Sequence, residues 1–111
     1  MKHQVIILPQ AEEDLKEIYQ YLIHHFSRKE WLEAYRKIRQ SIIQLKSFPE
    51  SGAIFPEVQE LHLTQYRQVI AGMNRIIYEI RSDIVYLHII CDSRREMKAL
   101  LARRLLTSPQ Y

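Results

Sequence analysis

Arginines at the ends of predicted strands are the residues of this sequence whose type and spacing best suit chemistry. Arg67 and Arg75 lie in two adjacent segments that read as strands, and Arg94 and Arg95 directly follow a third. A guanidinium group donates forked hydrogen bonds that match a phosphate or a carboxylate. If strand-borne arginines converge on one concave face, they can hold a phosphate. The alternative is that each arginine pairs with a nearby carboxylate of the same chain.

Other catalytic chemistry has little support in the sequence. There is no nucleophile elbow, no P-loop and no dinucleotide-binding motif. His24 and His25 are neighbours that point to different sides of a predicted helix, so they do not form a metal pair. The single cysteine, Cys91, ends a buried strand and is expected to be inert. His88 is expected to be a packed, hydrogen-bonded residue, and we expect neither a metal nor a cofactor.

The composition predicts one compact domain over residues 1–111, because 47% of the residues are hydrophobic. Residues 1–60 hold eight Lys/Arg against nine Asp/Glu, a net charge of −1, whereas residues 61–111 hold eight against four, a net charge of +4. A basic half can meet phosphate or an acidic protein. No apolar run approaches the roughly 20 residues that span a membrane, and no signal-peptide pattern is present. We therefore expect a cytoplasmic protein with no membrane partner.

Three predicted strands must position these arginines. Runs rich in β-branched and aromatic residues, separated by turn residues, predict strands at Tyr66–Ala71, Asn74–Arg81 and Ile84–Cys91. Alternation along the middle strand assigns Arg75 and Ile77 to one face and Ile76 and Tyr78 to the other. The third run is almost wholly apolar, which is typical of a strand covered on both faces. A further strand at residues 4–8 is expected to join the same sheet.

Two amphipathic helices are predicted between the first strand and the others. Pro9 suits the first turn of a helix whose apolar face comprises Ala11, Leu15, Ile18, Leu22 and Phe26. Ser27 and Glu30 match a capping box that starts a second helix, and Phe26 and Trp31 are spaced for a hydrophobic staple. The apolar stripe of this second helix comprises Trp31, Tyr35, Ile38, Ile42 and Leu45. So short a turn predicts an antiparallel αα-hairpin, with Trp31 buried at its packing interface.

The fold class that follows is α+β, in the order β-α-α-β-β-β-α. It comprises an N-terminal strand, the αα-hairpin, a three-stranded antiparallel meander and a C-terminal helix at residues 96–106. Residues 49–63 are expected to be a loop. The helices are expected on one face of an antiparallel sheet.

In this order the chain resembles toxins of the RelE/ParE superfamily, from bacterial type II toxin–antitoxin or plasmid-stabilisation modules. The matching pieces in the helical half are Ala11, Asp14-Leu15, Ile18, Tyr21, Leu45, Phe48-Pro49 and Gly52. Those in the sheet are Tyr66-Arg67, Arg75-Ile76-Ile77-Tyr78 and Ile89 through Asp92-Ser93-Arg94-Arg95. The resemblance spans nearly the whole chain, and it implies an αα-hairpin on an antiparallel sheet.

The superfamily holds two kinds of toxin, and the resemblance implies one or the other. RelE-like members are endonucleases that cut mRNA on the ribosome with basic residues of the sheet and a stacking tyrosine. ParE-like members generally lack that set and inhibit DNA gyrase. Carried over by position, the catalytic residues of a RelE-like enzyme would be Arg67, Arg75 and Arg94.

Two departures favour the ParE-like, non-enzymatic interpretation. Val69 stands where RelE has a second strand lysine, and Leu100 stands near the position of the stacking tyrosine. A base-stacking platform contributes roughly 1–3 kcal/mol to single-strand binding, so its loss weakens the hold on mRNA. Arginine stays protonated and is a poor proton-transfer group. A non-toxic relative that only binds antitoxin stays open as a third alternative.

The implied partners are a cognate antitoxin, ParD-like or similar, and DNA gyrase, with the ribosome and mRNA as the alternative target. The basic C-terminal half of the chain and the exposed parts of the helical hairpin are the expected surface for the antitoxin. The expected partner-binding residues in the basic half are Arg94, Arg95, Lys98, Arg103 and Arg104.

Overall fold

The computed structural model describes residues 3–106. The strands are β1 (Gln4–Ile7), β2 (Tyr66–Ala71), β3 (Asn74–Arg81) and β4 (Ile84–Asp92). The helices are α1 (Pro9–His25), α2 (Arg28–Ser47), α3 (Pro56–Glu60) and α4 (Met97–Leu101), with a 3₁₀ turn η1 (Pro49–Ser51) and a π-type turn η2 (Ala102–Leu106). The predicted α+β class and element order are confirmed.

The sheet has four strands in the order β1-β4-β3-β2. The meander β2-β3-β4 is antiparallel, as predicted. The first strand joins it as expected, but β1 pairs with β4 in parallel, so the sheet is mixed. This arrangement follows from the chain path, because the hairpin and β2-β3 separate β1 from β4 and leave room for a crossover.

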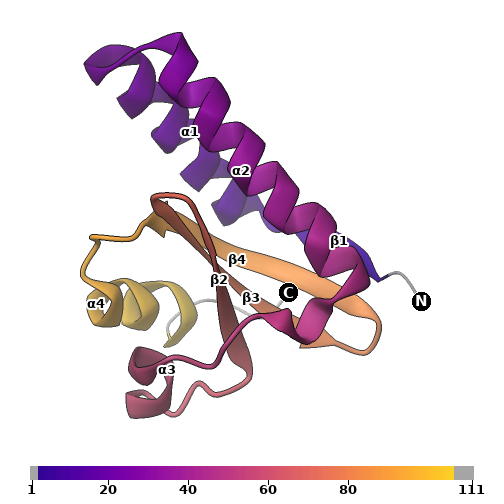
Figure 1. The fold of residues 1–111 in the computed structure, drawn as a ribbon. Coiled ribbons are helices and arrows are strands. Elements are labelled where there is room, and N and C mark those ends of the chain that lie inside the picture. The colour runs from indigo at the N-terminus through magenta and orange to yellow at the C-terminus, as the bar shows by residue number, and fades with distance from the viewer. Residues whose placement is uncertain (1–2, 107–111) are drawn as a thin grey trace.

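Helices cover both faces of the sheet, which corrects the expectation of one covered face (Figure 1). The hairpin α1-α2 lies on one face, and the short helices α3 and α4 lie on the other. The expected loop over residues 49–63 contains η1 and α3. Helix α4 begins after Glu96, whose side chain accepts a hydrogen bond from the Ala99 N–H at 2.7 Å, and it gives way to η2 at Ala102.

Alternation along β3 divides the core into two clusters. Ile76 and Tyr78 pack under the hairpin, whereas Ile77 packs with α3 and α4 on the opposite face. A bulge in β4 lies at His88, because Ile77 is opposite Ile89 while Tyr78 is opposite Leu87. Beyond the bulge the alternation of β4 is reset. The almost wholly apolar β4 is thereby covered on both faces, as its sequence predicts.

The hairpin extends past the sheet at its tip, near residues 20–32 (Figure 1). The predicted cap is present, since the Ser27 Oγ accepts a hydrogen bond from the Glu30 N–H at 3.3 Å. The prediction that Trp31 is buried is wrong. Its side chain is only partly buried and lies against the rings of Tyr19 and Tyr35, and Phe26 is 62% exposed. The overhang is the physical reason, because no strand lies beneath the tip to cover these residues.

Candidate functional site

Arg67 faces the hairpin side of the sheet and holds the chain segment that follows α2. It lies opposite Tyr78, and residues opposite each other on paired strands share a face. The Arg67 Nη1 donates hydrogen bonds to the backbone oxygens of Gly52 at 2.9 Å and Glu50 at 3.2 Å. Its guanidinium group is thus used inside the fold.

Arg75 faces the other side of the sheet. It lies opposite Cys91, which belongs to the cluster under α3 and α4. Its Nε donates to the Gln68 Oε1 at 2.6 Å, and its guanidinium carbon lies 5.2 Å from the centre of the Phe55 ring. With an ion pair to Glu57 at 3.5 Å, the side chain is 11% exposed. Arg67 and Arg75 therefore do not converge on one face, and Arg75 pairs with a carboxylate of the same chain, the alternative that the sequence left open.

Arg104 is also used inside the fold. Its Nη1 and Nη2 donate to the two carboxylate oxygens of Asp14 at 3.0 and 3.1 Å, and Nη2 also donates to the backbone oxygen of His88 at 2.7 Å. The Asp14 carboxylate accepts a further hydrogen bond from the Ile90 N–H at 3.0 Å. The Arg104 and Asp14 side chains are 12% and 13% exposed. This cluster joins α1, β4 and η2, and it gives Arg104 a structural role.

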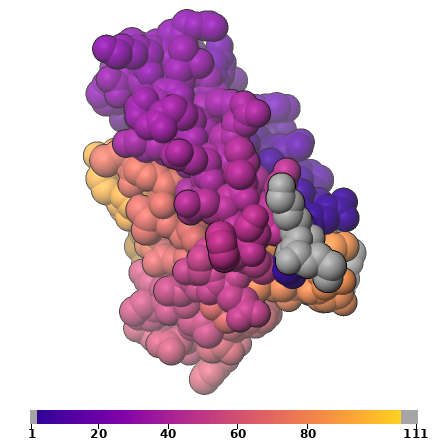
Figure 2. Space-filling view, turned by 45° about the vertical axis from the view of Figure 1, so that its right-hand side comes forward, coloured from indigo at the N-terminus to yellow at the C-terminus, as the bar shows by residue number. Residues whose placement is uncertain are grey.

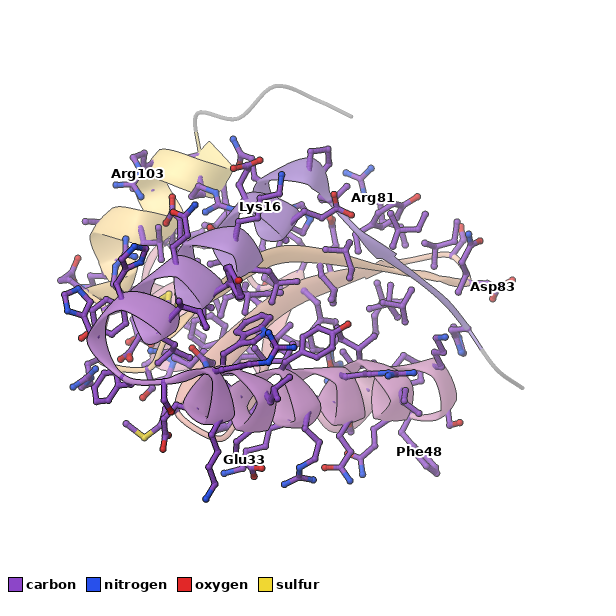
Figure 3. All side chains as sticks on the ribbon, turned by 90° about the horizontal axis from the view of Figure 1, so that it is seen from above. Lys16, Glu33, Phe48, Arg81, Asp83 and Arg103 are labelled. Atoms are coloured by element: carbon purple, nitrogen blue, oxygen red, sulfur yellow. The ribbon has the colours of Figure 1, made fainter. Side chains whose placement is uncertain are left out.

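The other residues expected to bind a partner lie nearer the surface. Lys98 forms an ion pair with Glu60, the last residue of α3. Arg103 is exposed on η2 and points away from the fold (Figure 3). Glu57 likewise forms an ion pair with Arg75. Acidic residues of the segment 50–60 thus neutralise part of the positive charge of residues 61–111. A role for Lys98 and Arg103 in partner binding stays a prediction.

Arg94 and Arg95 are exposed in the turn that follows β4. The Arg94 side chain is 71% exposed, and it forms a forked pair with Asp92, with Nε–Oδ1 and Nη2–Oδ2 distances of 2.9 Å. These hydrogen bonds hold the pKa of the Asp92 carboxyl below its usual value. The Asp92 Oδ1 also accepts from the Arg94 N–H at 2.8 Å. Asp92 therefore holds the turn so that both arginines reach solvent.

A groove of about 610 Å³ lies between the hairpin and the end of the sheet where β2 turns into β3 and β4 ends. We call it the hairpin groove. Ile18 and Leu22 of α1 and Ala34 of α2 line it from the hairpin, and Ala71 and Ile90 line it from the sheet. The overhang creates this space, because the helices there have no strand to pack on.

Charged and aromatic side chains border the apolar centre of the groove. The acidic residues come mainly from the helices, whereas two of the three basic residues come from the turn after β4. They are Asp14, Glu17, Glu30, Glu33, Asp92, Lys37, Arg94 and Arg95. Tyr21, Phe26 and Met73 add large exposed apolar surface to the rim. An apolar centre with charges of both signs at its border suits an amphipathic polypeptide segment.

The comparison with protein families decides the classification. The family described as the ParE toxin of the type II toxin–antitoxin system, parDE, matches residues 5–96. The chain belongs to the ParE toxin family. The chain is therefore a toxin of a type II toxin–antitoxin system, and the predicted superfamily is confirmed.

A solved structure supports the ParE fold independently. It is described as the chromosomal ParDE TA system from P. aeruginosa, and a chain of it superposes with a TM-score of 0.67 at 15% sequence identity. The alignment covers 82% of this chain and 96% of that chain. At so low an identity the likeness shows the fold alone. Comparison with curated proteins gives no significant match.

Within this ParE fold, burial shifts the pKa values of both Cys91 and His88. Burial raises the pKa of the Cys91 thiol to about 11, so the thiolate is scarce. Burial also lowers the pKa of His88, although the hydrogen bond to Glu79 at 3.0 Å opposes that shift. No cluster of metal-ligating side chains occurs within residues 3–106. In the same range, no helix is both long and apolar enough to cross a membrane.

The sequence predicted that exposed parts of the hairpin bind an antitoxin, but it did not predict the hairpin groove itself in this ParE-family chain. Ile18 and Leu22, which line the groove, were assigned to the apolar face of the first helix. A usable signal was the small size of Ala34 and Ala71, two residues that line the groove where a packed core would hold larger side chains. The second signal was the cluster of aromatic residues around the turn between the helices.

Proposed function

We propose that this toxin inhibits DNA gyrase and is neutralised by a cognate antitoxin that occupies the hairpin groove. The observation that carries the gyrase proposal is the placement of Arg67 and Arg75 on opposite faces of the sheet. Ribosome-dependent mRNA cleavage requires basic side chains gathered around one phosphate. These two guanidinium groups are instead bound to the chain's own carbonyl, amide and carboxylate oxygens.

The available proton-transfer group near the sheet is also enclosed. His88 is 8% exposed, and its ring packs edge-on against Tyr66 at 5.0 Å between ring centres. A general base must come within hydrogen-bond reach of the proton that it removes. A nucleic acid at the surface is out of reach of this ring. The geometry therefore supports a toxin that acts by binding.

The chemistry of the hairpin groove supports a peptide-like antitoxin segment as its occupant. The apolar centre would take two or three large apolar side chains spaced along an amphipathic segment. Arg94 and Arg95, which line the groove from the turn after β4, favour acidic side chains of the antitoxin, and Glu30 and Glu33, which line it from α2, favour basic ones. Such a segment orders as it binds, so its affinity depends on the apolar anchors more than on the rim charges.

One purified sample tests the target. We expect the toxin to block the supercoiling of plasmid DNA by gyrase, to leave mRNA intact in the presence of ribosomes, and to lose its effect when antitoxin is added. Cleavage of mRNA that depends on ribosomes, abolished by Arg75→Ala, would overturn the proposal. Inactivity in both assays with tight antitoxin binding would indicate the non-toxic relative instead.

Two variants in the turn after β4 test whether this turn takes part in binding gyrase. Arg94→Ala and Arg95→Ala should weaken gyrase inhibition without loss of fold, because both side chains are exposed. Lys16→Ala is a matched control, since it removes an exposed basic side chain of α1 that is 70% exposed and does not line the groove. Equal inhibition by all three variants would exclude the turn after β4 from the target-binding surface.

The antitoxin proposal has a further test in the genome. A toxin of this kind is expected beside a small acidic or ribbon-helix-helix reading frame. We expect the product of that frame to bind the toxin with nanomolar or tighter affinity and to protect Tyr21 and Met73 from solvent. If no such frame adjoins the gene, the proposed neutralisation by a cognate antitoxin loses its basis.

A further inference from the structure

The outer surface of α2 carries an exposed stripe that combines basic and large apolar side chains. The stripe residues recur at helical spacing and are Arg28, Leu32, Tyr35, Arg39, Ile43 and Lys46. Leu32 and Ile43 are 50% and 52% exposed. Within residues 3–106, no ion pair satisfies Arg28, Arg39 or Lys46. In Figure 2, α2 forms a ridge along the visible face of the molecule.

The adjacent helix α1 has the opposite charge. Its residues Pro9–His25 include four acidic side chains and one lysine, a net charge of −3, whereas α2 has six basic side chains and two acidic ones, a net charge of +4. Lys16 of α1 and Glu33 of α2 point to opposite sides of the hairpin (Figure 3). Glu12 and Glu13 are exposed near the start of α1. On the outer face the acidic charge of α1 is smaller, because Asp14 pairs with Arg104 and Glu17 lines the hairpin groove. Glu13 pairs with Lys16 at 3.3 Å, so Glu12 is the acidic side chain of α1 that is left to meet the basic stripe of α2.

An aromatic cluster joins the two helices. The Trp31 ring lies 5.2 Å from that of Tyr19 on α1 and 5.3 Å from that of Tyr35 on α2, as measured between ring centres. Both tyrosines remain about two-fifths exposed, at 42% and 41%. Exposed aromatic surface of this kind is enriched at protein interfaces.

We propose that this outer face of the hairpin binds a second copy of the chain. A two-fold axis that runs along the hairpin places α1 of each copy on α2 of the other, so that acidic meets basic twice. A two-fold axis across the hairpin places like helix on like helix, and repulsion disfavours it. In the favoured arrangement the axis passes between α1 and α2, so the aromatic clusters of the two copies meet. The interface is isologous and closed.

This symmetry also predicts which charges meet. Tyr19 and Trp31 lie at one level of the hairpin, because their rings are in contact. Two helical turns farther from the tip, α1 reaches Glu12 from Tyr19 and α2 reaches Arg39 from Trp31. Glu12 and Arg39 therefore lie at one level too. Because an axis along the hairpin preserves the level, Arg39 of one copy faces Glu12 of the other, beside the Glu13–Lys16 pair.

The size of the face sets the expected strength. Helices of 17 and 20 residues are about 26 and 30 Å long, and a face two helices wide covers roughly 500 Å². Two such faces bury about 1,000 Å², at the lower end for a specific interface. We therefore expect a dimer with a Kd of tens of micromolar that weakens as salt is raised. The hairpin groove lies on the side of the hairpin that faces the sheet, so dimer formation leaves it open and does not depend on the proposed function.

Sedimentation equilibrium of the full chain tests the dimer. From about 5 to about 500 µM protein, we expect the dimer fraction to rise, with a Kd lower in about 50 mM than in about 500 mM NaCl. Arg39→Glu should raise the Kd at least about tenfold, and the combination with Glu12→Arg and Glu13→Arg should restore it. Lys29→Glu is the matched control, because it makes the same charge change on α2 outside the stripe.

Two results would overturn the proposal. The first is a wild-type chain that stays monomeric across this range, and the second is a dimer that Arg39→Glu leaves unchanged. In the second case, weaker binding of the antitoxin by Arg39→Glu would assign the stripe to the antitoxin. Circular dichroism of each variant ensures that a change in Kd is not caused by loss of the fold.

Discussion

Removing Arg104 should destabilise the fold more than removing any surface arginine. Its guanidinium group connects Asp14 of α1 with the backbone of β4, and both charged side chains are nearly buried. Truncation to Arg104→Met keeps much of the apolar stem but leaves the Asp14 carboxylate without its counter-charge. Breaking a buried pair in this way costs about 3–5 kcal/mol. A domain of this size has roughly 5–15 kcal/mol of stability in total, so a substantial share is lost.

Urea denaturation followed by circular dichroism measures this loss. Arg36→Met is the control, because Arg36 forms a similar pair with Glu33 on the exposed surface of α2. That variant should unfold at the same urea concentration as the wild type, since exposed pairs contribute little. The double variant Arg104→Met with Asp14→Leu should recover part of the loss, because neither charge is then left unpaired. An Arg104→Met variant within about 1 kcal/mol of the wild type would refute the structural role of Arg104.

Three further predictions concern other parts of the fold. Tyr78→Phe removes a hydroxyl that donates to the Pro49 backbone oxygen at 2.6 Å and accepts from the Gly52 N–H at 2.9 Å, and it should cost about 1–3 kcal/mol in urea denaturation. Trp31→Ala should cost about 2 kcal/mol, roughly half the value for a fully buried tryptophan, because Trp31 is partly exposed at the hairpin tip; a loss above about 4 kcal/mol would contradict that placement. The pKa of His88 is lowered in the fold, so the unfolded chain takes up the proton first as the pH falls below about 6.5. The free energy of unfolding should then decrease below that pH, and His88→Gln should flatten this dependence in denaturation curves taken between about pH 7.5 and 5.5.

The elements of this fold are predictable because each has a local cause. The period of the apolar residues gives α1 and α2, Ser27 marks the boundary between them, and turn residues separate the strands of the meander. The limits of β2 and β3 follow directly from those signals, and β4 is one residue longer than predicted. The parallel pairing of β1 is not a local property, since a short apolar strand can join either edge of a sheet in either direction.

The use of each arginine is not predictable from its neighbours in the sequence. Arg67 and Arg75 lie on opposite faces because the register of β2 and β3 places one opposite Tyr78 and the other opposite Ile70. Arg104 was expected to bind a partner because it lies at a basic helix end, but its guanidinium group binds the carboxylate of Asp14, which is distant in the sequence. Charged side chains take part in contacts that only the packed elements bring together. Of the arginines expected to bind a partner, Arg94, Arg95 and Arg103 are exposed, and the first two lie in the turn that follows β4.

The overhang of the hairpin links the two surfaces for which partners are proposed. If the sheet extended as far as the hairpin, it would cover Leu22 and Trp31. There would then be no hairpin groove on the sheet side of the tip and no exposed aromatic cluster on its outer side. The extra turns of helix therefore cost apolar burial that a purely structural hairpin would retain. That cost is offset if both sides of the tip are covered by other polypeptide, with the antitoxin on the side of the sheet and a second copy on the outer side. Shortening the hairpin by one turn on each helix should then weaken both associations while the isolated domain loses little stability.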